Sequence, residues 1–217
     1  MRTIKLLFAA ATATMLAAPV AADEVAVNIM PGVASVEVMH KGDKVVIQRN
    51  QDEQNTVNPA FAKTSRKCPP FCIQPTSLAP GVETIGEDEV LRYAKAMSDG
   101  DETIVLVDSR TPDWVERGTI PSARNIPWTA LNPAKGADPI SISEIMEGVF
   151  NVGSNEELMD FSNCKTAVMF CNGMWCGQSP NNIRNLLKFG YPAHKIKWYR
   201  GGMQDWEILG LTTVPGG

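Results

Sequence analysis

The sequence predicts an α/β protein whose helices cover both faces of a mostly parallel sheet, preceded by a small β-rich N-terminal unit. After about residue 86, stretches with helical periodicity alternate with apolar strand-like runs. These runs are continuously apolar, as in strands buried on both faces. Before residue 80, β-branched runs are instead joined by a short turn. The 217 residues suffice for one core and a smaller appended unit.

Residues 1–22 resemble an export signal. Arg2 and Lys5 precede an apolar run that ends in small residues before Asp23. A membrane anchor is the alternative, but the run is alanine-rich and shorter than a typical span. We expect cleavage near Asp23 and a periplasmic or secreted protein. No later run is apolar enough to cross a bilayer, so no membrane span is expected after cleavage.

The charge of the chain argues against a nucleic-acid partner. Without residues 1–22, 18 Lys and Arg and 24 Asp and Glu remain, which gives a net charge of −6. A protein that binds a phosphate backbone needs a basic surface, and the sequence shows neither a basic stripe nor a nucleic-acid motif.

The first predicted element is a hairpin in the N-terminal unit, residues 23–80. The runs "SVEVMH" and "KVVIQ" are joined through Lys41-Gly42-Asp43, which suits a tight turn. A polar stretch then leads into "KCPPFCIQP", where Cys68 and Cys72 form either a local disulfide or a redox-active pair. No second cysteine pair or histidine stands at zinc spacing, so no metal site is expected. Residues 76–86 form a predicted linker.

The elements after the linker alternate. Strands are predicted at 103–110, 165–170 and 196–202, and helices at 87–97, 141–150, 154–161, 181–190 and 203–210, the helix at 181–190 being closed by Gly190. Ligands of such sheets bind at the carboxyl ends of the strands. The loop "CNGMWCGQSP", residues 171–180, follows one of these ends.

The loop at residues 171–180 contains the candidate reactive residues. Ser179 and Pro180 predict a helix start, with Ser179 as the N-cap. Gly173 and Gly177 let backbone N–H groups turn inward and stabilise an anion, either a Cys171 thiolate or an oxyanion beside it. We therefore predict that Cys171 is a nucleophile rather than a buried small hydrophobe.

Cys176 is the second cysteine of the loop. Five residues of spacing bring it within disulfide reach of Cys171 if the geometry allows. It either resolves a persulfide or mixed disulfide on Cys171 or is an inert loop cysteine. The five cysteines are an odd number, so at least one thiol stays unpaired within the chain.

From about Ile85 to Thr213 the chain resembles a rhodanese (sulfurtransferase) domain. The motifs are "VDSRTPDWVERGTIPSARNIPW", the Cys171 loop, "LLKFGYP" and "WYRGGMQDW". The resemblance implies a three-layer sandwich around a five-stranded sheet in residues 85–213. It also implies a persulfide on Cys171, a small sulfur donor such as thiosulfate, a thiol acceptor and no cofactor. A partner protein is a further expectation. The substrate-binding loop comprises Asn172, Gly173, Met174, Trp175, Gly177, Gln178 and Ser179.

The chain departs from the family pattern in its loop. The common pattern is Cys-x-x-Gly-x-Arg-Ser, whereas this loop is two residues longer and has no arginine between Cys171 and Ser179. This weakens the case for small dianionic donors. It also argues against the related phosphatases, which clamp phosphate with an arginine. Thr119 stands where the family has histidine, and Asp108 and Arg110 are expected to pair at the sheet end.

Three functions remain open from the sequence. The first is an exported sulfurtransferase with a Cys171 persulfide and Cys176 as resolving thiol. The second is a periplasmic thiol-disulfide oxidoreductase or redox partner that uses Cys171, Cys176 and the pair Cys68 and Cys72. The third is a non-catalytic docking module on a rhodanese-like scaffold.

Overall fold

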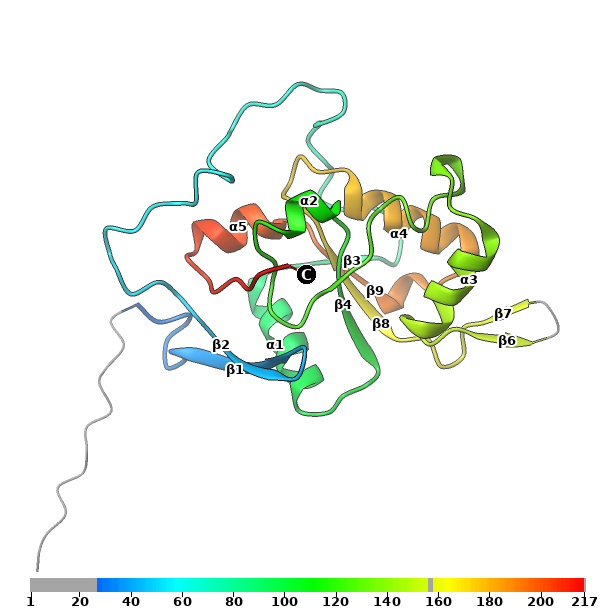
Figure 1. Ribbon diagram of the computed structural model, residues 1–217, viewed down its shortest axis with the longest axis horizontal. Helices are drawn as coiled ribbons and strands as arrows, with labels where there is room; N and C mark the ends of the chain where they lie inside the picture. Colours follow the sequence, from blue (N-terminus) through cyan, green and yellow to red (C-terminus); the bar gives the residue numbers. More distant parts are fainter. Residues whose placement is uncertain (1–26, 156–157, 217) are drawn as a thin grey trace, which may run out of the picture.

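The computed structural model describes residues 27–155 and 158–216 (Figure 1). The predicted export signal, residues 1–22, lies outside the described residues. A five-stranded parallel sheet forms the centre, in the order β3 (Glu83–Ile85), β9 (Ile196–Tyr199), β8 (Thr166–Phe170), β4 (Ile104–Asp108) and β5 (Arg124–Asn125). The predicted α/β class is confirmed.

Helices cover both faces of the sheet. They are α1 (Glu87–Ser98), α2 (Pro112–Val115), α3 (Pro139–Gly148), α4 (Gln178–Phe189) and α5 (Gly202–Ile208), with short 3₁₀ turns at Pro133–Lys135 and Ala193–Lys195. Along β4, Val105 and Val107 belong to the core that includes side chains of α3 and α4. The alternate residues, Ile104 and Leu106, belong to the core shared with α1 and α5. This alternation explains why β4 reads as a continuous apolar run.

The predicted N-terminal hairpin is confirmed as β1 (Ser35–His40) and β2 (Asp43–Gln48). His40 pairs with Asp43, so the turn consists of Lys41 and Gly42, whose φ angles of 51° and 91° are typical of a two-residue hairpin turn. Val38 and Ile47 are buried in the same core as α1. After the hairpin, the chain from residue 49 to 82 has no regular strand and loops over the side of the molecule that carries α5 and α2 (Figure 1).

Two predicted elements differ from the structure. The predicted linker at 76–86 contains β3, an edge strand of three residues, which is too short to show a periodic pattern. The predicted helix at 154–161 is wrong, because the antiparallel strands β6 (Gly153–Asn155) and β7 (Leu158–Asp160) lie there. Leu158 is 74% exposed and Met159 37% exposed, so these residues provide no buried face that would hold a helix.

The helix at 181–190 was predicted correctly at its carboxyl end. Gly190 caps α4 in the left-handed conformation, with φ 98°, and its N–H bonds to the last turn. No helix among the described residues is both long enough and apolar enough to cross a membrane.

Candidate active site

The site lies at the carboxyl ends of β4 and β8. The end of β4 is fixed by a fully buried ion pair, in which Arg110 donates from Nε and Nη2 to the Asp108 carboxylate. The predicted pairing of these two residues is confirmed. Thr119, at the position of the family's histidine, donates to Asp108 Oδ2 at 2.7 Å. The Asp108 carboxylate is therefore saturated by donors and organises the loops next to the site.

The Cys171 loop is anchored by the first turn of α5. The backbone N–H groups of Met203 and Gln204 donate to the carbonyls of Cys171 and Asn172 at 2.9 and 3.0 Å. Gly202 makes this approach feasible: its φ is +57°, and a Cβ there would lie 2.3 Å from the Cys171 carbonyl oxygen. The second glycine of "WYRGGMQDW", Gly202, thus allows the backbone of α5 to approach the backbone of the Cys171 loop.

Ser179 donates a hydrogen bond from its hydroxyl to the Cys171 sulfur at 3.1 Å. The prediction that Ser179 caps α4 is wrong, because the helix begins at Gln178 and Gly177 is its N-cap. Ser179 therefore lies inside the first turn, fully buried, where its hydroxyl serves the sulfur instead of the helix backbone. The indole N–H of Trp198 in β9 donates to the Ser179 oxygen at 3.1 Å. This bond leaves the hydroxyl proton for the sulfur.

The pKa of the Cys171 thiol is lowered to about 7. Burial by itself would raise this pKa, but hydrogen bonds from the Cys176 thiol, the Ser179 hydroxyl and the backbone N–H groups of Ser179 and Gly173 outweigh it. Gly173 has φ +153°, within the region that favours glycine. The loop thus stabilises a thiolate on Cys171 near neutral pH.

The pKa of the Cys176 thiol shifts in the opposite direction to that of Cys171. Burial, the hydrogen bond to Cys171 and the negative charge on Cys171 all raise the pKa of Cys176 well above its ordinary value. The two thiols therefore differ in role: Cys171 ionises first, and Cys176 stays protonated. Both cysteines are buried and neither is in a disulfide. Cys164, the third free cysteine, lies in the core, where burial raises its pKa.

The N-terminal segment covers this loop. Cys68 and Cys72 form a disulfide, and Phe71 between them packs edge-on against Trp175 with ring centroids 5.7 Å apart. The backbone N–H of Gln74 donates to the Met174 carbonyl at 2.8 Å. We call residues 66–76 the lid. The sequence indicated the cysteine pair and raised the hypothesis that it approaches the Cys171 loop; in the structure, Phe71 between the two cysteines lies against Trp175 of that loop.

A pocket of about 260 Å³ lies between the lid and the loop. It is lined by Pro70, Phe71, Trp114, Trp128, Asn172, Trp175, Cys176, Gly177, Gln178 and Asn181. Of the predicted loop residues, Met174 is 40% exposed, whereas Asn172 and Gly173 are buried. Three residues of the site were not predicted, because a tryptophan in a strand or a phenylalanine next to a proline is typical of packing and a lone glutamine gives no signal; they are Trp198, Phe71 and Gln74.

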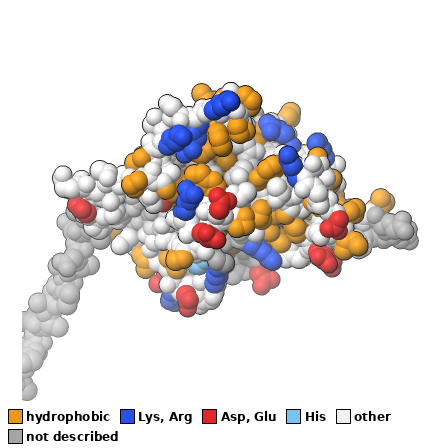
Figure 2. All heavy atoms as spheres, turned by 45° about the horizontal axis from the view of Figure 1, so that its top comes forward, with side chains coloured by type: hydrophobic (Ala, Val, Ile, Leu, Met, Phe, Trp, Pro, Cys, Tyr) orange, Lys and Arg blue, Asp and Glu red, His pale blue; other side chains and the backbone are white. Residues whose placement is uncertain are grey.

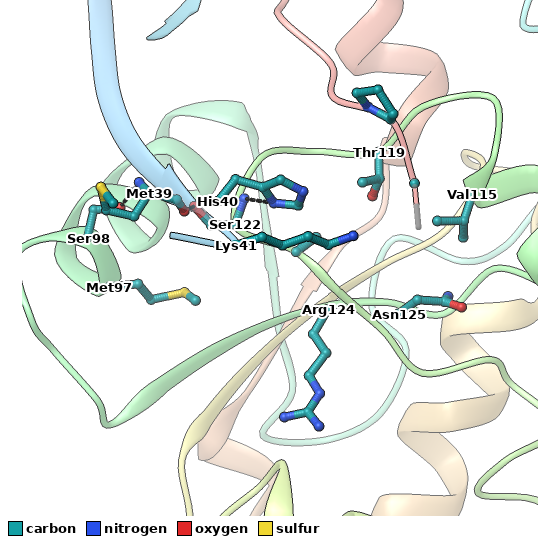
Figure 3. Close-up of a pocket in the computed structure, with 13 residues that line it drawn as sticks. Met39, His40, Lys41, Met97, Ser98, Val115, Thr119, Ser122, Arg124 and Asn125 are labelled. Carbon is teal, nitrogen blue, oxygen red and sulfur yellow. Dashed lines mark hydrogen bonds between the residues drawn. The ribbon is translucent and has the colours of Figure 1, made fainter. Parts of the chain in front are cut away.

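A second cavity, of about 570 Å³, lies elsewhere (Figure 3). Residues of β1, α1, β5 and the carboxyl-terminal segment line it, and none of them belongs to the Cys171 loop. Here His40 Nδ1 accepts from the Ser122 backbone N–H at 3.1 Å. Within residues 27–155 and 158–216, no cluster of three or more His, Cys, Asp or Glu has the arrangement of a metal site.

The chain is thus an α/β protein with a five-stranded parallel sheet, and its candidate site is a cysteine loop at the carboxyl ends of the strands. Residues 90–209 match the rhodanese-like domain, which is more than half of the chain, and the chain therefore belongs to the rhodanese-like family. A comparison with curated protein sequences gave no match.

Several solved structures are similar to this chain at low sequence identity. One is thiosulfate sulfurtransferase from Pseudomonas aeruginosa, with 19% identity and a TM-score of 0.37, covering 63% of this chain and 21% of that one. Another is SseA from Escherichia coli, described with the 3-mercaptopyruvate sulfotransferases, with 20% identity and a TM-score of 0.38, covering 57% and 43%. A third is the BH2092 protein from Bacillus halodurans, with 18% identity and a TM-score of 0.38, covering 57% and 70%.

Proposed function

We propose that this protein is an exported sulfurtransferase that carries a sulfane sulfur as a persulfide on Cys171. The observation that carries the proposal is the set of N–H, S–H and O–H donors directed at the Cys171 sulfur, which lowers the pKa of its thiol to about 7. A thiolate at neutral pH is the nucleophile that sulfur transfer needs. Export rests on the signal-like residues 1–22 alone.

The transfer has two steps. The Cys171 thiolate attacks the outer sulfur of a donor such as thiosulfate; a new S–S bond forms, the donor's S–S bond breaks, and sulfite leaves with the electron pair. A thiolate acceptor then attacks the terminal sulfur of the persulfide and releases the Cys171 thiolate. The donors that stabilise the thiolate also stabilise the negative charge on the persulfide.

Cys176 supplies a second route. The Cys176 thiol can give its proton to the terminal sulfur of the persulfide while its own sulfur attacks the inner sulfur, so that a disulfide forms between Cys171 and Cys176, the persulfide S–S bond breaks and the terminal sulfur leaves as hydrogen sulfide. An external thiol then reduces the disulfide. The close approach of the two residues, with the Cys171 sulfur 3.5 Å from the Cys176 carbonyl oxygen, supports this role for Cys176.

A thiol-disulfide oxidoreductase is the second candidate. It is favoured by the two neighbouring buried thiols, Cys171 and Cys176, and by the disulfide of the lid, next to which Phe71 packs on Trp175 of the loop. An oxidoreductase of this kind carries no sulfur atom and exchanges only electrons with its partner thiols.

Intact-mass measurement separates the two candidates. The reduced mature protein is treated with thiosulfate, and we expect an early gain of one sulfur atom, which a thiol reductant removes and which is lost later as Cys176 resolves the persulfide. The Cys171→Ser variant should show no gain, whereas Cys164→Ala, which removes the core cysteine, should gain sulfur like the parent. A gain that persists in Cys171→Ser would remove Cys171 from the mechanism.

A further inference from the structure

The Cys171 loop contains no Lys or Arg, but Arg66 of the lid lies next to it. No Lys or Arg stands between Cys171 and Ser179. Arg66 lies over the loop, with its guanidinium carbon 3.9 Å from the centroid of the Trp175 ring and 5.9 Å from the rings of both Phe71 and Trp114. All three aromatic side chains line the pocket next to Cys176. Arg66 precedes residues 90–209, which match the family.

The protein does not use the hydrogen-bonding capacity of Arg66 fully. Its Nε is buried and has no hydrogen-bond partner, and no ion pair among the described residues includes Arg66. Partial burial lowers the pKa of Arg66, while its interaction with Cys176 acts in the opposite direction. A buried N–H group of a guanidinium without an acceptor is unfavourable, and an anionic ligand would relieve it. Stacking on Trp175 occupies the face of the group and leaves its N–H edge for such a ligand.

The surroundings favour an anion. None of the residues that line the pocket beside Cys176 is acidic, and three of them, Asn172, Gln178 and Asn181, carry amide groups. Although the whole chain has a net charge of −4, Lys and Arg side chains lie among hydrophobic ones in the upper part of the face shown in Figure 2. An anion that approaches this loop therefore meets a partly desolvated cation and no opposing carboxylate in the pocket.

We propose that Arg66 binds the anionic group of the molecule that reacts with Cys171. The ligand class is a sulfur compound with an oxyanion end, such as a thiosulfate or thiosulfonate, whose oxygens accept from the guanidinium edge. The inference rests on the proposed function in that Cys171 is the reacting group. It assigns recognition of the donor to a residue outside the matched domain, held in place by the lid.

Two alkylating agents of different charge test this role without any sulfur transfer. Iodoacetate is an anion and iodoacetamide is neutral, and both react with the same thiolate by displacement of iodide. The rate constant of each at Cys171 is measured by peptide mapping in the parent, Arg66→Gln, Arg66→Lys and Arg117→Gln. Arg117 is the matched control, because it also stacks on a tryptophan of the pocket, 4.3 Å from the Trp114 ring, but is exposed.

We expect the ratio of the iodoacetate rate to the iodoacetamide rate to fall about tenfold in Arg66→Gln. Arg66→Lys should keep part of the ratio, and Arg117→Gln should leave it unchanged. If both rates in Arg66→Gln fall by the same factor, Arg66 acts on the thiolate or on the lid fold, and the proposal is overturned. An equal fall of the ratio in Arg117→Gln would overturn it too, because a general surface field would then explain the effect. Failure of Cys171 to gain sulfur would refute the proposed function and leave this ratio informative.

Discussion

The Ser179 hydroxyl lies 3.1 Å from the Cys171 sulfur, although eight residues separate the two in the chain. The loop curls back so that the first turn of α4 faces the end of β8. Trp198 of β9, the neighbouring strand, completes the chain of hydrogen bonds from indole to hydroxyl to sulfur. Two consecutive donors, from β9 and α4, thus act on the sulfur at the end of β8, and the ionisation of the sulfur depends on both of them.

Replacing Ser179 with Ala should raise the pKa of Cys171, because one donor to the thiolate is lost. In the parent, the rate of alkylation by iodoacetamide should rise with pH through a midpoint at about pH 7, where half of the thiol is ionised, and level off about two pH units higher. In Ser179→Ala the midpoint should move up by about one pH unit. Ser162→Ala, which changes an exposed serine, is the control. An unchanged midpoint in Ser179→Ala would show that the backbone donors suffice.

Replacing Trp198 with Phe keeps an aromatic ring in the core and removes the indole N–H. The Ser179 hydroxyl then loses the donor that fixes its orientation, so the alkylation midpoint of Cys171 should rise by less than in Ser179→Ala. In the double variant the two shifts should not add, because Trp198 acts only through Ser179. Additive shifts would mean that Trp198 influences the sulfur by another route.

Replacing Cys176 with Ser should lengthen the lifetime of the Cys171 persulfide, because the resolving thiol is absent. After loading with thiosulfate, the parent should release hydrogen sulfide and form a disulfide between Cys171 and Cys176. The variant should retain the added sulfur until an external thiol is supplied. Sulfide release and intact mass are measured together. Equal release from parent and variant would assign Cys176 no role in resolution.

Replacing both Cys68 and Cys72 with Ser tests the lid. Loss of the cross-link should cost about 2 kcal/mol, since the closed loop is short, and should lower Tm by about 4–8 °C if the lid unfolds together with the rest. Calorimetry gives Tm, and the sulfur-loading assay gives turnover. A loss of stability with turnover intact identifies a staple. Intact stability with lost turnover identifies a relay of electrons or sulfur between the lid and the Cys171 loop.

Replacing Gly202 with Ala should disrupt the Cys171 loop. A Cβ at this position would lie 2.3 Å from the Cys171 carbonyl oxygen and 2.9 Å from the Gly173 nitrogen, and both are backbone atoms. We expect a loss of about 2 kcal/mol or more in unfolding free energy and a higher alkylation midpoint for Cys171. Gly148→Ala is the matched control, because a Cβ there meets no atom within 4 Å. Similar stability of the two variants would contradict the close approach seen here.

The order of strands and helices along most of the chain follows from the sequence, because the long elements bury whole faces. The runs at β4 and β8 and the apolar stripe of α4 are governed by burial, which leaves a periodic signal. Short elements do not leave one: β3 has three residues and β5 two, and both are held by pairing with strands distant in sequence. The strands β6 and β7, where the sequence suggested a helix, have three residues each and pair with each other, and they too are too short to leave a periodic pattern.

The sequence by itself determined the family, the loop and the identity of the two neighbouring cysteines, because glycine spacing and strand ends are local features. Tertiary structure alone decided which donors reach each sulfur. The sequence predicts Ser179 as a helix cap, but α4 begins one residue before it, and its hydroxyl donates a hydrogen bond to the Cys171 sulfur instead. Arg66 lies in a polar, weakly patterned segment and Phe71 follows two prolines, and only the folded lid brings both side chains against Trp175. Contacts between residues so far apart depend on how the chain closes in space, and no local pattern records that closure.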